Sequence, residues 1–130
     1  IALVSTQAGI DVVLIDQSQE AADRGKAYSE TYMDNGIKRG KATSEKKEAL
    51  LSRITATTDY AALKDADLII EAVFEDPQIK ATVTKAVEAV IPETCIFASN
   101  TSTLPISDLA KSSVRPEQFI GNHFFSRGAR

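Results

Sequence analysis

Short apolar runs alternate along the chain with longer stretches in which apolar residues recur at helical spacing. Such runs, rich in β-branched residues, are typical of strands buried in a parallel sheet. Strong runs lie at 10–15, 68–73, 95–98 and 119–125, and a weaker one lies at 54–58. The spacing predicts helices at 1–8, from 19 to about 33, at 44–53, from 77 to just before residue 92, and at 106–111.

Several of these boundaries carry a recognisable signal of their own. Gly9 suits the C-cap of the first helix, and Ser18 can cap the start of the second. Asp76 followed by Pro77 is typical of a helix start, because the acid caps free N–H groups and proline fits the first helical position. Pro92 is expected to stop that helix.

The second predicted helix has one apolar face and two predicted breaks after it. The face comprises Ala21, Gly25, Tyr28 and Tyr32. The breaks are Asn35-Gly36 and Arg39-Gly40, after which the helix at 44–53 begins. Two helices between consecutive strands are more than one crossover needs, so we expect an inserted helical hairpin at 19–53.

Strands that alternate with helices predict an α/β fold, a parallel sheet with helices on both faces. The chain opens inside a helix and lacks an initiator methionine. A crossover into the strand at 10–15 requires an earlier strand, so we expect a first strand upstream of residue 1.

Composition and charge narrow the class of protein. The 130 residues suffice for one domain with a core, and the net charge of −3 argues against a nucleic-acid partner. Residues 24–53 nevertheless hold eight Lys/Arg against four Asp/Glu, which suits either an anionic ligand or a solvated helical face. The single cysteine, Cys95, excludes an internal disulfide, is expected to pack in its apolar run, and favours a reducing compartment. No run approaches the roughly 20 apolar residues of a membrane span, and the opening is not a convincing signal peptide.

Polar residues follow two of the predicted strands where each strand ends. Asn100, Thr101 and Ser102 follow one, and His123, the only histidine, lies at the end of the other. Since ligands of open α/β sheets bind beyond the carboxyl ends of the strands, Ser102 and His123 are predicted to meet at one crevice. A neutral imidazole there suits proton removal from an alcohol. The alternatives are a core histidine and ordinary turn residues. No nucleophile elbow, no metal-ligand spacing of Cys and His, and no P-loop competes.

Three charged residues are further candidates. Asp16 ends the strand at 10–15, where an acid can accept hydrogen bonds from the ribose of a dinucleotide, although an ordinary turn fits equally. Glu75 precedes the helix start, and capping is its alternative role. Lys80 is expected one turn into that helix, on the side of the crevice. Glu71 lies within an apolar strand and is expected to be paired or at the sheet's end.

Three segments together resemble the NAD-binding domain of L-3-hydroxyacyl-CoA dehydrogenases, most closely the version in bacterial and peroxisomal multifunctional fatty-acid oxidation proteins. They are IIEAVFEDPQIK at 69–80, ASNTSTL at 98–104 and FIGNHFFS at 119–126. The resemblance implies a Rossmann-type doubly wound parallel sheet with the inserted hairpin, lacking its first strand. A partial NAD-binding domain then covers 1–126, an atypical tail covers 127–130, and the family's C-terminal helical domain is absent.

The resemblance also implies roles for single residues. His123 matches the family's catalytic base, and Ser102 the serine that binds the substrate oxygen and lies beside the cofactor. Asn100 matches a residue next to the nicotinamide, Glu75 and Lys80 match cofactor contacts, and Asp16 matches the acid on the adenosine ribose. The hairpin corresponds to the family's coenzyme A region. The family's Gly-rich turn and the glutamate that orients the histidine would lie before residue 1 and beyond Arg130.

The implied reaction is oxidation of an L-3-hydroxyacyl-CoA to the 3-ketoacyl-CoA with NAD, and the 130 residues alone are expected to have little or no activity. A related hydroxyacid or sugar-acid dehydrogenase and a non-catalytic nucleotide-binding module are the alternatives. The implied partners are an acyl-CoA and, for the parent protein, a second copy or a multifunctional complex. The expected compartment is the cytoplasm of a bacterium, or a peroxisome or mitochondrion in a eukaryote.

Overall fold

The computed structural model describes residues 1–125, and the chain divides into two compact units, the first covering Ile1–Ala62 and the second beginning at Leu63. Unit 1 contains α1 (Ala2–Gln7), β1 (Val12–Ile15), α2 (Gln19–Lys38), α3 (Ser44–Ser52) and β2 (Ile54–Thr57). Unit 2 contains β3 (Leu68–Glu71), α4 (Pro77–Glu88), β4 (Ile96–Asn100), α5 (Ile106–Ala110) and β5 (Phe119–Asn122). Two short 3-10 helices that the sequence did not predict lie at Tyr60–Leu63 and Pro116–Gln118.

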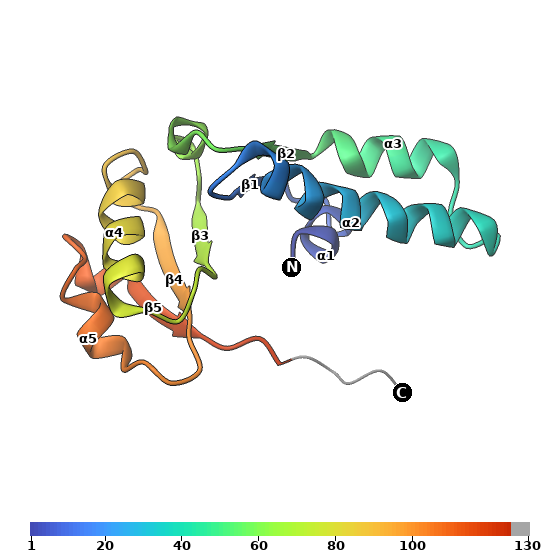
Figure 1. The fold of residues 1–130 in the computed structure, drawn as a ribbon. Helices are drawn as coiled ribbons and strands as arrows, with labels where there is room; N and C mark the ends of the chain where they lie inside the picture. The colour runs from blue at the N-terminus through green and yellow to red at the C-terminus, as the bar shows by residue number, and fades with distance from the viewer. Residues whose placement is uncertain (126–130) are drawn as a thin grey trace. The chain divides into compact units, whose positions relative to one another are not determined.

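Unit 1 is a parallel strand pair with the predicted helical hairpin between its strands. β1 and β2 pair in register from Val12 opposite Ile54 to Ile15 opposite Thr57. Figure 1 shows α2 and α3 lying side by side beyond these strands. The buried side chains of Met33, Leu50 and Ile54 form the core that joins hairpin to strands. The residues of β1 are half-buried, whereas the apolar run predicted burial on both faces.

The long helix α2 differs from its prediction in length and in orientation. It continues through Asn35-Gly36 to Lys38, and it ends where Gly40 adopts a left-handed φ of 68°. A glycine inside a helix costs only about 1 kcal/mol. Burial of Met33 against α3 offsets this cost, so the helix continues for another turn. Its buried residues are Ala22, Ser29 and Met33. The predicted apolar face is wrong, because Tyr28 is 70% exposed and Tyr32 is 54% exposed.

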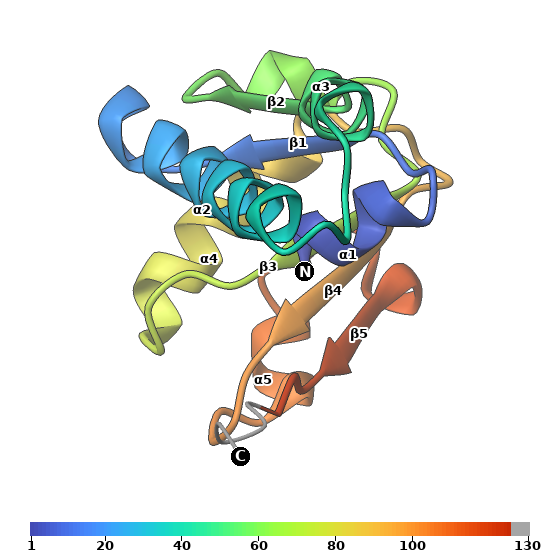
Figure 2. The same ribbon diagram turned by 90° about the vertical axis from the view of Figure 1, so that its right-hand side faces the viewer.

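Unit 2 is a three-stranded parallel sheet in the order β3-β4-β5, and Figure 2 shows β4 and β5 as parallel neighbours. The register sets Glu71, Ser99 and Gly121 in one row across the sheet. Asp76 accepts hydrogen bonds from two N–H groups at the start of α4, at 2.8 and 2.9 Å, which confirms the predicted helix start. Gly121 permits close packing of α5, because a Cβ there would overlap the Ile106 side chain.

The strands agree with the predicted fold class, and one strand boundary needs correction. Within residues 1–125 the parallel strands form two groups, β1-β2 and β3-β4-β5, and no strand in this range pairs with both β1 and β3. The strand expected before residue 1 stays a prediction. The last strand ends at Asn122 instead of 125, because the Phe124 N–H leaves the ladder and donates to the Asn100 side chain. The tail at 127–130 lies outside the described residues. Across residues 1–125, no helix is long and apolar enough to cross a membrane.

Candidate active site at the carboxyl ends of the strands

Ser102 and His123 follow neighbouring parallel strands at the same edge of the unit 2 sheet. Ser102 lies two residues after β4, and His123 directly follows β5. Both side chains are exposed, and the His123 ring packs edge-to-face against Phe125 with the ring centroids 4.5 Å apart. This arrangement places a hydroxyl and an imidazole at the edge where open α/β sheets bind their ligands.

The Glu75 carboxylate organises the loop that carries Ser102. Thr101 Oγ1 donates a hydrogen bond to Glu75 Oε1. The Ser102 N–H and hydroxyl donate to Glu75 Oε2 at 3.2 and 3.4 Å. The hydrogen bond from Thr101 is the largest cause of a lowered Glu75 pKa, and the Ser102 N–H and the Lys80 charge add to it against desolvation. Glu75 is therefore more than the helix cap that its position alone suggested, since it bridges the loops after β3 and β4.

This lowered pKa predicts a pH dependence of the loop. Because the folded-state pKa lies below the ordinary value of 4.5, the contribution of Glu75 to stability is present above pH 4.5. It is lost as the pH falls from there through the folded-state pKa, when protonation removes the negative charge that strengthens these hydrogen bonds. Glu75→Gln is expected to flatten the stability curve in this acid range, as measured by urea unfolding at several pH values. Glu93→Gln is the control, because within residues 1–125 the exposed Glu93 carboxylate accepts no hydrogen bond. Equal curves for wild type and Glu75→Gln would contradict the prediction.

Asn100 joins the ends of β4 and β5. Its side-chain Oδ1 accepts a hydrogen bond from the Phe124 N–H at 3.2 Å, immediately after His123. The Thr101 N–H donates to the Asn122 carbonyl at 3.4 Å and extends the contact between the same two segments. The site predicted from separate segments of sequence is thus connected by hydrogen bonds, although the roles of its residues stay predictions.

Lys80 lies one turn into α4, as expected, but its side chain is only 2% exposed. Its Nζ donates to Glu71 Oε1 at 2.8 Å and to the Asn100 carbonyl at 3.3 Å. Ser99 Oγ donates to Glu71 Oε2 at 2.5 Å. Glu71 is therefore paired, which is one of the two expectations for it. Ser99 was not predicted to belong to the site, because nothing in an apolar strand signals a partner in another strand.

Asp16 lies in unit 1, at the carboxyl end of β1. Its side chain is exposed, and its Oδ1 accepts a hydrogen bond from the Gln17 N–H at 2.7 Å. An exposed carboxylate just beyond a parallel strand suits the hydroxyls of a ribose. The donor and acceptor chemistry therefore fits the adenosine end of NAD.

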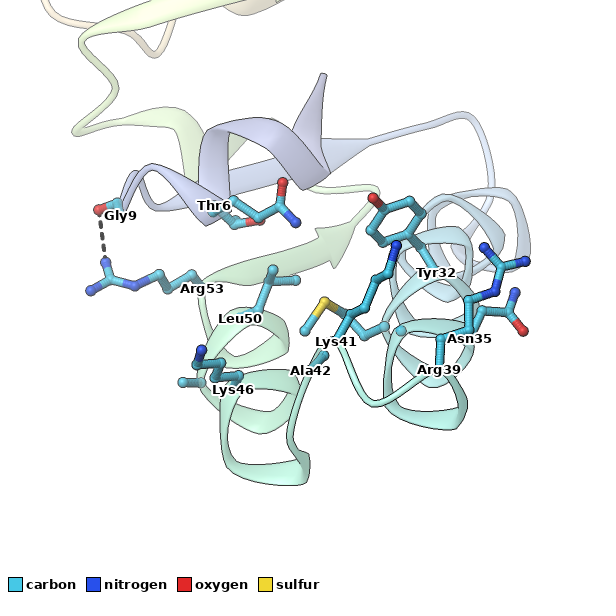
Figure 3. Close-up of a pocket in the computed structure, with 14 residues that line it drawn as sticks. Thr6, Gly9, Tyr32, Asn35, Arg39, Lys41, Ala42, Lys46, Leu50 and Arg53 are labelled. Carbon is cyan, nitrogen blue, oxygen red and sulfur yellow. Dashed lines mark hydrogen bonds between the residues drawn. The ribbon is translucent and has the colours of Figure 1, made fainter. Parts of the chain in front are cut away.

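Unit 1 also contains a basic pocket of about 760 Å³ between the end of α1, the last turns of α2, and α3. Figure 3 shows Tyr32, Arg39 and Lys41 around it, with Lys46 and Arg53 on the side of α3. Arg53 is bound to the Gly9 carbonyl and to Asp11, each at 3.0 Å. Within residues 1–125, Arg39, Lys41 and Lys46 form no ion pair. The basic stretch at 24–53 thus contributes cationic side chains to a pocket. This placement suits the anionic ligand, one of the two alternatives that the charge pattern left open.

The architecture defines a Rossmann-type dehydrogenase domain. The structure matches the (S)-3-hydroxybutyryl-CoA dehydrogenase of Ralstonia eutropha with a TM-score of 0.89 and 37% identity, over 95% of this chain and 44% of that one. It matches the 3-hydroxybutyryl-CoA dehydrogenase of Escherichia coli K12 with a TM-score of 0.88 and 35% identity, over 95% of this chain and 26% of that one.

A family model, the NAD-binding domain of 3-hydroxyacyl-CoA dehydrogenase, matches residues 1–128. The chain belongs to this family. It is 43% identical over 124 residues to a fatty acid oxidation complex subunit alpha of a Shewanella species (strain W3-18-1). That match covers 95% of this chain and 18% of the relative, so the chain spans about a fifth of the relative's length.

Proposed function

We propose that the full-length protein containing this chain oxidises L-3-hydroxyacyl-CoA to 3-ketoacyl-CoA. The observation that supports this most directly is the placement of Ser102 and His123 directly after neighbouring parallel strands of a domain of this family. The names of the relatives support the substrate class, since the two solved structures are 3-hydroxybutyryl-CoA dehydrogenases.

In this proposal the residues of unit 2 hold the substrate alcohol and remove its proton. Ser102 Oγ binds the 3-hydroxyl oxygen, and a neutral ring nitrogen of His123 takes the hydroxyl proton as the C–O bond becomes a carbonyl. Bound NAD+ would supply the hydride acceptor for the same carbon, so that one proton and one hydride would leave the alcohol. Asn100 fixes the segment after His123 through the Phe124 N–H. Asp16 binds the adenosine ribose and Glu75 borders the cofactor, whereas Lys80, expected from the resemblance to contact the cofactor, is buried and supports this edge from beneath.

The basic pocket of unit 1 is proposed to bind the phosphate-bearing end of coenzyme A. Coenzyme A carries several negative charges, and the pocket is lined by Arg39 at the end of α2, Lys41 in the turn and Lys46 in α3. Arginine pairs with phosphate through two parallel hydrogen bonds, so Arg39 is the side chain expected to contribute most. This pocket favours a CoA substrate over a free hydroxyacid or sugar acid.

Arg39→Ala is expected to raise KM for acetoacetyl-CoA about five- to tenfold with little change in kcat, because it removes uniform binding energy. KM for the N-acetylcysteamine thioester of acetoacetate, which lacks the phosphates, should stay unchanged. Lys38→Ala is the matched control, since Lys38 is an exposed cation beside Arg39 that does not line the pocket. Equal increases in KM for both thioesters would show that the pocket does not bind the phosphates of coenzyme A.

The proposed function is tested by following NADH absorbance with acetoacetyl-CoA and the full-length protein. Oxidation of NADH supports the proposal. Turnover of free hydroxyacids but not of the thioester would favour the related dehydrogenase. NADH binding without turnover of either substrate would favour the non-catalytic module.

The assembly and compartment are also proposals. We propose a homodimer or a multifunctional complex, in keeping with the relative named as a complex subunit. A bacterial protein of this kind would act in the cytoplasm, and a eukaryotic one in a peroxisome or mitochondrion. The buried thiol of Cys95, whose pKa is raised by desolvation, suits a reducing compartment.

A further inference from the structure

A buried charged network lies beneath the candidate active site of unit 2. Glu71 is 4% exposed, Lys80 is 1% exposed and Ser99 is fully buried. Glu71 Oε1 accepts from Lys80 Nζ and from the Val73 N–H, both at 2.8 Å, and Oε2 accepts from Ser99 Oγ at 2.5 Å. The three donors of Lys80 are matched by Glu71 and by the carbonyls of Val73, at 3.5 Å, and Asn100, at 3.3 Å. Every charged atom of the pair thus has a protein partner.

The network lies directly behind the ends of the strands that carry the candidate active site. The network lies where β3, β4 and the first turn of α4 meet, and it reaches the carboxyl end of β4 through the Asn100 carbonyl. The Asn100 side chain then accepts from the Phe124 N–H, next to His123. Asn100 therefore links the buried network to the backbone beside His123, through a hydrogen bond at its carbonyl and another at its side chain.

Stability alone does not account for such a pair. Removing two charges from water costs several kcal/mol per ion in proteins, and apolar residues of similar volume are often as stabilising or more so. A rigid, fully satisfied polar network does fix the geometry of the backbone that it contacts. Through the hydrogen bond from Lys80 to the Asn100 carbonyl, the network reaches the end of β4, next to the loop that carries Ser102.

We propose that Glu71 is a positioning residue, which through Lys80 and Ser99 fixes the end of β4 so that Asn100 holds the backbone beside His123. This inference rests on the proposed function, because it assigns Glu71 to the reaction carried out at His123. It also gives buried Lys80 a role distinct from direct contact with the cofactor.

The test is the double variant Glu71→Gln/Lys80→Met in the full-length protein. Glutamine still accepts from the Val73 N–H and can donate to Ser99, and methionine removes the charge, so no unpaired ion stays buried. The hold on the Asn100 carbonyl is lost. We expect kcat to fall about ten- to a hundredfold, as small displacements in active sites do. The Kd for NADH should stay within a factor of three.

The matched control is Glu88→Gln. Glu88 is another buried carboxylate of α4, 8% exposed, but it accepts from Ser113 Oγ and the Val114 N–H at the opposite end of the helix. This variant is expected to lower the melting temperature and to leave kcat unchanged. A wild-type kcat in the double variant would overturn the proposal. An increase in the Kd for NADH with kcat unchanged would also overturn it, because Lys80 would then act as a cofactor contact.

Ser99→Ala keeps the proposal testable if the double variant does not fold. It removes one donor to Glu71 and is expected to lower kcat about threefold to tenfold, with an unchanged Kd for NADH. Unchanged kcat in Ser99→Ala would count against the network. Wild-type protein that does not turn over acetoacetyl-CoA would instead refute the proposed function.

Discussion

Replacement of His123 by alanine is expected to lower kcat for acetoacetyl-CoA reduction by about 10²–10⁴-fold, the contribution of a positioned general acid or base. In the direction of reduction the same ring gives the proton to the carbonyl oxygen. Because the His123 ring is exposed and packs edge-to-face against Phe125, its loss should not disturb the strands. The measurement is NADH oxidation by the full-length protein, together with NADH binding by fluorescence.

Two neighbouring hydroxyls provide the internal control. Ser102→Ala is expected to reduce kcat, since in the proposed mechanism Ser102 holds the substrate oxygen. Thr103→Val, the next residue and also exposed, should leave kcat unchanged. Full activity in His123→Ala would show that His123 is not the general acid or base of the reaction. Equal losses in Ser102→Ala and Thr103→Val would show that the loop is merely sensitive to substitution.

The elements near the site were predictable from local signals. The β3 run, the Asp76-Pro77 start of α4 and the apolar core of β4 each depend on neighbouring residues. The α4 start lies where the sequence predicted, whereas β3 ends at Glu71 instead of residue 73 and β4 covers Ile96–Asn100 instead of 95–98. The polar residues that follow β4 and β5 meet at one edge because parallel strands end together. Local pattern and topology together therefore sufficed to bring Ser102 and His123 to the same edge.

The features that the sequence missed depend on contacts between distant residues. Nothing near Glu71 indicates that it binds Lys80 nine positions away and Ser99 in the next strand. The Asn35-Gly36 pair predicted a break, but packing of Met33 against α3 outweighed that local preference. The basic pocket required the hairpin to fold back on α1, which charge counting cannot show.

Phe97→Ala is expected to destabilise unit 2 by about 3–5 kcal/mol, the usual cost of truncating a buried aromatic residue. Phe97 is 2% exposed, and its ring stacks on that of Phe119 with centroids 5.1 Å apart and planes inclined by 10°. The stacked pair joins β4 to β5, the two strands that Ser102 and His123 follow. Loss of the Phe97 ring should therefore weaken the packing between these two strands.

Ile96→Ala is the matched control for this truncation. Ile96 precedes Phe97 on the other face of β4 and is 43% exposed, so its truncation should cost roughly 1 kcal/mol or less. Native-state hydrogen exchange over peptides of unit 2 measures the loss in this domain alone, because exchange reports the free energy of local opening. Equal losses in the two variants would show that the stacked pair does not dominate the core. A selective loss in Phe97→Ala, with faster exchange at residues 99–104, would show that the same core that holds the sheet together also holds the site in place.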